Sequence, residues 1–193
     1  MFEPTNAALK EWAVVCNALA DGRQIVLIRK GGIEEIKAGF QVMHHDFWLF
    51  PTYVHQKTAD LVPVVHAECD RVQAAQPAAT SVSVQLYATV TTAVKVTELD
   101  RLRALEGAHI LAWDAVAARF HYRRPGVHVL TLRVYRVPEP FVLSVQPWYD
   151  GCTSWVELHE SLDPSGAVPV ISDADFARRE ANVRALLGAT VAA

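Results

Sequence analysis

Two short segments of the chain carry cations in a pattern suited to binding an anion. The first is Arg29-Lys30-Gly31-Gly32, at the end of a short apolar run. The two side chains supply positive charge, and glycine lets backbone N–H groups approach an oxyanion closely. The GxxxxGK[ST] spacing of a P-loop is absent. The segment therefore predicts a small anion site, and a glycine turn with two solvated charges is the alternative.

The second segment, residues 119–136, has no carboxylate between Asp114 and Glu139. Its basic residues are Arg119, His121, Arg123, Arg124, His128, Arg133 and Arg136. Phe120, Tyr122 and Tyr135 are interleaved with them. Arginine beside aromatic rings suits phosphate contact combined with base stacking. The alternative is a helix end followed by a strand with one solvated face.

Arg133 is the unusual member of this segment, because it lies on the more polar side of a strand whose other side is Leu-Leu-Val. An arginine in a half-buried strand costs free energy unless its charge is paired or solvated in a cleft. With no carboxylate nearby in the sequence, its partner is a ligand anion or a distant carboxylate such as Glu34 or Glu35. We therefore predict that Arg29 and Arg133 belong to one anion site.

Histidines form a third candidate group. The cluster contains His44, His45, Asp46, His55, His66 and Glu68. Its spacings match neither HExxH nor a zinc finger, so we expect no metal and no cofactor. His45 and His55 remain candidates for an acid–base pair.

The chain has three cysteines, with no CxxC pair. Cys152 stands near His159, but no signature of a cysteine nucleophile surrounds it. An odd number of unpaired cysteines predicts a reducing compartment. With no basic leader and no long apolar run, we expect a cytoplasmic protein without a membrane anchor.

The elements that would position these residues mix strands and helices irregularly. Strands are predicted over residues 24–29, 47–50, 81–90 with an extension to Val96 past a bulge, and 127–137. Helices are predicted from Thr5 or Asn6 to about Ala20 and over residues 62–76, 97–107, 114–122 and about 173–187, the last with a capping box at Ser172 and Asp175. Pro138 is expected to end its strand, and residues 138–169 to form a loop with a short edge strand.

This pattern predicts an α+β fold with a curled mixed or antiparallel sheet and flanking helices, in a single domain over residues 1–193. Hydrophobic residues make up 51% of the chain, enough for a sizeable core. The expected core includes Trp12, Leu27, Val84, Leu86, Leu132 and Val134. The net charge of -3 implies that any nucleic acid would be held by a local basic patch.

Several runs resemble the bacterial family DUF1802, which has no settled activity. They are residues 12–24, 27–33, 50–56, 119–120, 130–136 and Gly151-Cys152-Thr153-Ser154-Trp155. More distantly, Gly22, Gln24, Leu27 and Arg29 have the spacing of the GxKxxExR element of the ASCH branch of the PUA-like superfamily. Those proteins are small β-barrels that bind RNA or modified nucleobases, and some are hydrolases. The resemblance favours a barrel, while Gln24 and Leu27 replace the element's Lys and Glu.

These observations together favour a protein that binds nucleic acid, RNA or DNA, or the phosphates of a nucleotide. A basic groove would contain Arg29, Lys30, Gly31, Gly32, Arg119, Tyr122, Arg123, Arg124 and Arg133. Tyr122 and Trp113 would supply stacking surfaces. The rival function is a metal-independent hydrolase or nuclease, with His45 or His55 acting on a phosphate held by Arg29 and Lys30. A module that binds a protein partner is a third possibility.

Overall fold

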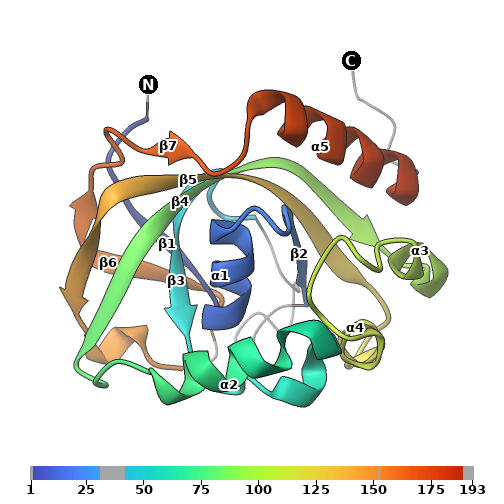
Figure 1. Cartoon of the computed structure of the whole chain (residues 1–193), viewed down its shortest axis with the longest axis horizontal. Coiled ribbons are helices and arrows are strands. Elements are labelled where there is room, and N and C mark those ends of the chain that lie inside the picture. Colours follow the sequence, from blue (N-terminus) through green and yellow to red (C-terminus); the bar gives the residue numbers. More distant parts are fainter. Residues whose placement is uncertain (1, 31–41, 152, 189–193) are drawn as a thin grey trace.

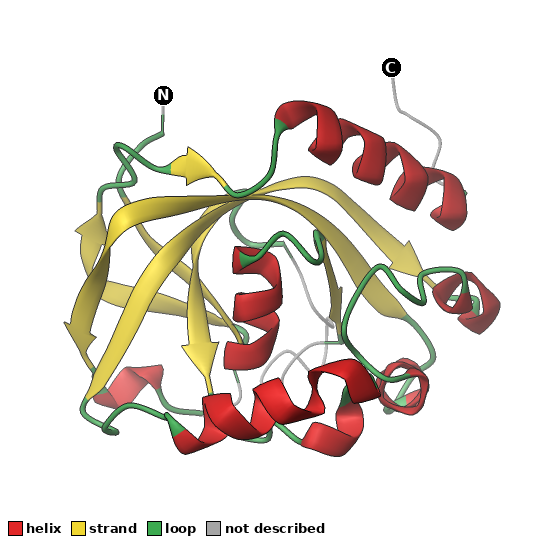
Figure 2. Ribbon diagram, in the orientation of Figure 1, coloured by secondary structure: helices red, strands yellow, loops and turns green. Residues whose placement is uncertain are grey.

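The computed structural model describes residues 2–30, 42–151 and 153–188. A curled sheet dominates the fold; one helix lies inside its curve and the others lie around it (Figures 1 and 2). The strands are β1 (Thr5–Trp12), β2 (Val26–Arg29), β3 (Asp46–Thr52), β4 (Ser81–Val96), β5 (Val127–Ser144), β6 (Trp155–Leu162) and β7 (Val168–Pro169). The helices are α1 (Ala13–Ala20), α2 (His66–Ala74), α3 (Leu99–Arg103), α4 (Trp113–His121) and α5 (Asp173–Leu187). The 3-10 turns are η1 (Thr58–Asp60), η2 (Pro63–Val65) and η3 (Pro147–Tyr149).

The strand order is β2-β5-β4-β3-β1-β6, and β7 pairs with β5. The β1–β3 pair is parallel and the remaining pairs are antiparallel, so the sheet is mixed. The expected α+β class and curled sheet are confirmed. In the described residues, β2 and β6 end the pairing order without pairing with each other, so the sheet is curled and open rather than a closed barrel.

Residues 5–12 form β1, although their apolar spacing predicted the first half of a helix. That prediction is wrong because β1 lies between β3 and β6 and is buried on both faces. Ala7 and Leu9 pack in one core cluster, whereas Ala8 packs in the other. A strand covered on both faces loses its alternating pattern, and periodicity then does not distinguish it from a buried helix. The helix begins only at Ala13.

Strand β5 continues well past Pro138, where the sequence predicted its end. Val84 of β4 pairs with Phe141, but Leu86 pairs with Arg136, so β5 carries extra residues at this point. Pro138 and Pro140 lie in that irregular stretch, where a missing N–H disrupts no regular ladder. The bulge predicted before Val94 is present as a second register shift, between Val90 and Thr92.

The sheet packs against two hydrophobic clusters. The larger holds α1, α2, α4 and α5 against the sheet, and the smaller lies among β1, β3, β6 and the paired ends of β4 and β5. Five of the predicted core residues are buried, and Trp12 is half-buried at the edge of the larger cluster. Ser172 Oγ accepts a hydrogen bond from Asp175 N at 3.1 Å, so α5 begins with the predicted cap.

Candidate functional site

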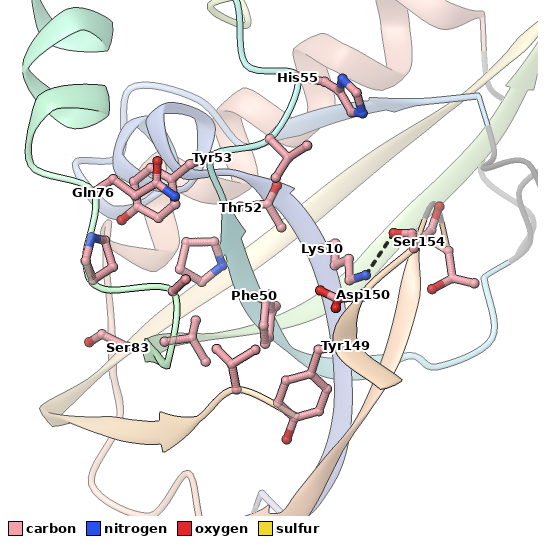
Figure 3. A pocket seen from close by; sticks show the side chains of 18 of the residues that line it. Lys10, Phe50, Thr52, Tyr53, His55, Gln76, Ser83, Tyr149, Asp150 and Ser154 are labelled. Carbon is pink, nitrogen blue, oxygen red and sulfur yellow. Dashed lines mark hydrogen bonds between the residues drawn. The ribbon is translucent and has the colours of Figure 1, made fainter. Parts of the chain in front are cut away.

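A cleft of about 990 Å³ lies at the end of the curled sheet where β1, β2 and β3 finish and β4 begins. Segments from several parts of the chain meet there (Figure 3). They are Lys10, residues 28–30, residues 50–55, residues 76–79, residues 81–83, the end of α4 with Tyr122, Val145, residues 149–151 and residues 153–154. Its volume is typical of a site for a small organic ligand.

The two basic segments predicted from the sequence meet in this cleft. Arg29 and Lys30 line it from the end of β2, and Arg119 and Tyr122 line it from the end of α4. A direct contact joins the segments, since Arg119 Nη1 donates to the Ile28 carbonyl at 3.2 Å. Lys10, on β1, adds a fourth cation. It was not predicted as a site residue, because it fell within the predicted helix. Gly31 and Gly32, the other half of the first segment, lie outside the described residues.

Arg29 is held by the carboxylate of Glu11. Arg29 Nη1 lies 2.8 Å from Glu11 Oε2 and also donates to the Lys10 carbonyl at 3.0 Å. Glu11 Oε1 accepts from the backbone N–H of Trp12 at 2.8 Å. Glu11 is only 5% exposed and does not line the cleft, so the carboxylate of this charge pair lies behind the cleft surface, and the pair links β2 to β1. Glu11 did not stand out in the sequence, because it fell within a predicted helix.

Lys30 holds the C-terminal end of α4. Its Nζ donates to the carbonyls of Phe120, at 3.0 Å, and of Arg124 and Gly126. An ammonium group has three donors, and these three carbonyls use them. Since carbonyls carry no formal charge, Lys30 contributes a net positive charge to the cleft. A cation here also complements the negative end of the helix dipole.

Arg119 is half-buried at the point where the two basic segments meet. Its guanidinium lies over the ring of Trp12, 4.8 Å from the centroid. Burial lowers the pKa of Arg119, while the nearby Glu11 carboxylate acts in the opposite direction. Arginine has so high an ordinary pKa that the group stays charged at neutral pH. The charge is therefore fixed, oriented and partly shielded from water, which strengthens its attraction for an anion.

Tyr122 is the exposed aromatic side chain of the cleft, with 49% of its surface accessible. The guanidinium of Arg123 lies over its ring at 4.8 Å. Arg123 and Arg124 themselves do not line the cleft; they lie in the exposed turn that follows α4. Trp113, the other predicted stacking residue, packs at the start of α4 under Arg103, 3.9 Å from its ring.

The opposite part of the cleft is apolar and carries hydroxyl groups. Phe50 and Tyr149 lie together in the cleft (Figure 3) and pack edge to face. Their ring centroids are 5.4 Å apart. Tyr53, Ser83 and Ser154 lie along the same cleft. Burial raises the pKa of Tyr53, so its hydroxyl stays protonated and able to donate a hydrogen bond. The rings in this part suit a flat group, and Lys10 and Asp150 lie beside them.

The turn η3 connects the cleft with the outer edge of β6. Tyr149 lines the cleft with its ring, and its hydroxyl accepts from the backbone N–H of His159 at 2.9 Å. The adjacent Trp148 donates from its indole to the Glu157 carbonyl at 3.1 Å. Two aromatic side chains therefore satisfy backbone groups of β6 that no strand satisfies in the described residues.

Arg133 lies apart from the cleft. Its Nη1 donates to the Ile171 carbonyl at 2.8 Å, and its Nη2 is paired with Asp173 at the start of α5. Its guanidinium also lies over the ring of Phe176, 5.0 Å from the centroid. The structure therefore does not bring Arg29 and Arg133 into one anion site, since each contacts a different carboxylate on a different element. Glu34 and Glu35, the partners considered for Arg133, lie outside the described residues.

The sequence of this chain matches a family model, Domain of unknown function (DUF1802), over residues 8–182. The chain belongs to the DUF1802 family. No curated protein matches its sequence significantly. Three solved structures of an ASCH protein from Zymomonas mobilis are similar to the fold. The unsubstituted protein is 12% identical with a TM-score of 0.44, covering 91% of this chain and 92% of its own. Two single-substitution mutants are 14% and 13% identical, with TM-scores of 0.44 and 0.45 and coverage of 82% and 80% of this chain and 92% and 90% of theirs.

At the two positions where the DUF1802 chain departs from the ASCH element, the residues have structural roles. Gln24 is buried, donates from Nε2 to the Val26 carbonyl at 2.8 Å and accepts from Ile110 N at 3.1 Å. Leu27 is buried in the larger core cluster. Neither lines the cleft, so neither would contact a ligand bound there.

The histidine cluster of this DUF1802 chain is dispersed. His55 lines the cleft with a φ of 62°, whereas His45 lies in a second cavity of about 470 Å³ beside Asp46 and Tyr87. The predicted acid–base pair of His45 and His55 is therefore not brought together. His66 contacts the Leu61 carbonyl at 2.9 Å, and Glu68 is paired with Arg23. Cys152 lies outside the described residues, and no described helix has the length and apolar character to cross a membrane.

Proposed function

We propose that the cleft binds a nucleotide, or a nucleotide unit of an RNA or DNA strand, through its phosphate and its base. The observation that carries this proposal is the charge balance of the cleft. Lys10, Arg29, Lys30 and Arg119 line it, and Asp150 is the one carboxylate among its described lining residues. The chain as a whole has a net charge of -3, so the cleft is more positive than the rest of the chain.

The partners of these cations support the same proposal. The Arg29 charge is offset by Glu11, but Lys30 and Arg119 hydrogen-bond to backbone carbonyls in the described residues, which leave their charge in place. Lys10 Nζ donates to the Gly151 carbonyl at 3.1 Å, so it is held at the cleft rather than extended into solvent. Positive groups fixed before binding stabilise an anion at little cost in conformational entropy.

The aromatic part of the cleft suits a base. Tyr122 offers an exposed ring beside the cations, and Phe50, Tyr53 and Tyr149 provide an aromatic lining further along. Stacking of a base on an aromatic side chain contributes about 1–3 kcal/mol, whichever base it is. A ligand with an anionic end and a flat apolar end therefore matches both parts of the cleft.

Binding of a fluorescent single-stranded oligonucleotide and of nucleoside monophosphates tests the proposal. Arg119→Gln and Tyr122→Ala should each weaken binding by about 1–3 kcal/mol. Arg178→Gln removes one exposed charge from α5 and is the matched control, since Arg178 lies outside the cleft. Thermal unfolding of each variant separates impaired binding from impaired folding. Binding of the Arg119 and Tyr122 variants equal to that of the control would exclude the cleft as the site.

A further inference from the structure

A row of basic side chains crosses three strands beside the cleft. Arg29 of β2 pairs with His128 of β5, and His128 pairs with Lys95 of β4. Directly opposed residues of neighbouring antiparallel strands have their side chains on the same face. Arg29, His128 and Lys95 therefore form one line, which we call the basic row. Its first member lines the cleft, and its last, Lys95, is exposed.

Lys95 and Lys30 lie close enough to affect each other and to affect the protonation of His128. Burial lowers the pKa of His128, and the neighbouring Lys95 and Lys30 lower it further. Burial also lowers the pKa of Lys30, with Lys95 adding to the shift. Among the described residues, the charged neighbours that shift these two pKa values are therefore cations. Lys30 and Lys95 therefore repel each other, and an anion bound between them would offset that repulsion.

The turn after α4 brings two more arginines to this surface. Lys30 binds the carbonyls of Arg124 and Gly126, which fixes the turn beside the basic row. Arg123 lies over the ring of Tyr122, and that ring lines the cleft. The turn with Arg123 and Arg124, together with the basic row, thus extends the basic surface beyond the cleft. Arg123 and Arg124 both belong to the second basic segment and lie outside the cleft itself.

We propose that the ligand of the cleft extends out of it along the basic row, where Lys95 and His128 contact a second phosphate group of the same molecule. This inference rests on the proposed function, because the first phosphate is the one bound in the cleft. Two strand spacings separate Arg29 from Lys95, roughly 10 Å. One phosphate group does not span that distance, so the ligand carries several. The backbone of a single nucleic-acid strand and a nucleoside polyphosphate both provide such a chain of phosphates.

Three probes distinguish these ligands: a nucleoside monophosphate, a nucleoside triphosphate and a single-stranded oligonucleotide of about six nucleotides. Lys95→Gln and His128→Gln should leave affinity for the monophosphate unchanged and weaken a probe that reaches the row about tenfold. For Lys95→Gln, the log–log slope of oligonucleotide affinity against salt should become shallower by about 0.7, because the variant no longer neutralises one phosphate. Arg178→Gln serves again as the charge-matched control. An effect on the triphosphate as well as the oligonucleotide identifies a polyphosphate chain, and an effect on the oligonucleotide alone identifies a strand.

The result that overturns this inference differs from the one that overturns the proposed function. If Lys95→Gln and His128→Gln bind all three probes normally while Arg119→Gln does not, the second phosphate site is excluded and the cleft remains. If Arg119→Gln and Tyr122→Ala also bind normally, both proposals fail. Because Lys95 is exposed, its variant is expected to fold, which keeps the test valid even if His128→Gln perturbs β5.

Discussion

Glu11 and Arg29 form a charge pair beside the cleft, with Oε2 and Nη1 2.8 Å apart and both side chains largely buried. The pair joins neighbouring parts of the curled sheet that are not hydrogen-bonded as strands, since β1 and β2 occupy distant positions in the pairing order. It therefore contributes to the shape of the cleft as well as to its charge.

Removing one partner of this pair should be strongly destabilising. Glu11→Ala leaves the Arg29 guanidinium without its carboxylate, and losses of about 3–5 kcal/mol are typical when a buried pair is broken. Urea unfolding of Glu11→Ala, Arg29→Ala and the double variant measures the coupling. The double variant should lose less than the sum of the two single losses, because the residues interact directly. Additive losses would show that the two charges act independently.

Lys30→Ala should loosen the end of α4, because three carbonyls lose their donor. The expected loss is about 1–3 kcal/mol. An ammonium ion is small enough to replace the missing Nζ, so Tm should rise more in ammonium chloride than in sodium chloride at equal ionic strength. The wild-type protein is the control and should show no such difference. Equal Tm values for the variant in both salts would contradict a specific cation role.

Arg133→Gln should reduce stability without affecting ligand binding. Arg133 is 6% exposed and connects β5 to the start of α5 through Asp173 and the Ile171 carbonyl. Asp173→Asn is the milder change, because the Asp173 side chain is exposed. Hydrogen exchange of α5 should accelerate in Arg133→Gln, while affinity for the oligonucleotide stays at the wild-type value. A weakened affinity with a normal rate of hydrogen exchange would show that Arg133 contributes to ligand binding.

His109 should make the protein less stable as the pH falls below neutrality. Burial lowers the pKa of His109 from 6.5 to about 4. Above about pH 6.5 the group is neutral in both states and contributes no pH dependence. Between pH 6.5 and 4 the unfolded chain binds the proton and the folded chain does not, so stability falls, by an amount on the order of 3 kcal/mol.

Chemical denaturation of the wild type and of His109→Gln across this pH range measures the contribution of His109. The variant should show a flatter profile between pH 6.5 and 4 and the same profile above it. Identical slopes in both proteins would mean that other groups account for the acid sensitivity.

Much of the fold could be predicted from local patterns. The alternation along residues 81–90 identified β4, and Ser172 with Asp175 marked the start of α5. The segment that failed was residues 5–12, where both faces are buried and the alternation that marks a strand is absent. The end of β5 was predicted too early because Pro138 was expected to stop the strand. A bulge accommodates Pro138 and Pro140, and the strand continues.

The candidate site was predictable only in part. Arg29, Lys30, Arg119 and Tyr122 stood out because glycines or aromatic residues surround them in the sequence, and the structure brings them together. Lys10 and Glu11 were missed with their strand. Arg133 was assigned to the site because no carboxylate is near it in sequence, but Asp173, which is distant in sequence, is its partner. Such pairings depend on tertiary contacts that no local pattern specifies.

The two aromatic residues of η3 have a consequence for how the protein behaves at high concentration. An uncovered edge strand offers its backbone groups to other chains and promotes self-association. Trp148 and Tyr149 occupy such groups on β6, at Glu157 and His159. Because the Tyr149 ring also forms part of the cleft, a substitution there that reshapes the ligand site also uncovers β6. Redesign of the cleft at Tyr149 should therefore be accompanied by lower solubility, whereas redesign at Tyr122 should not.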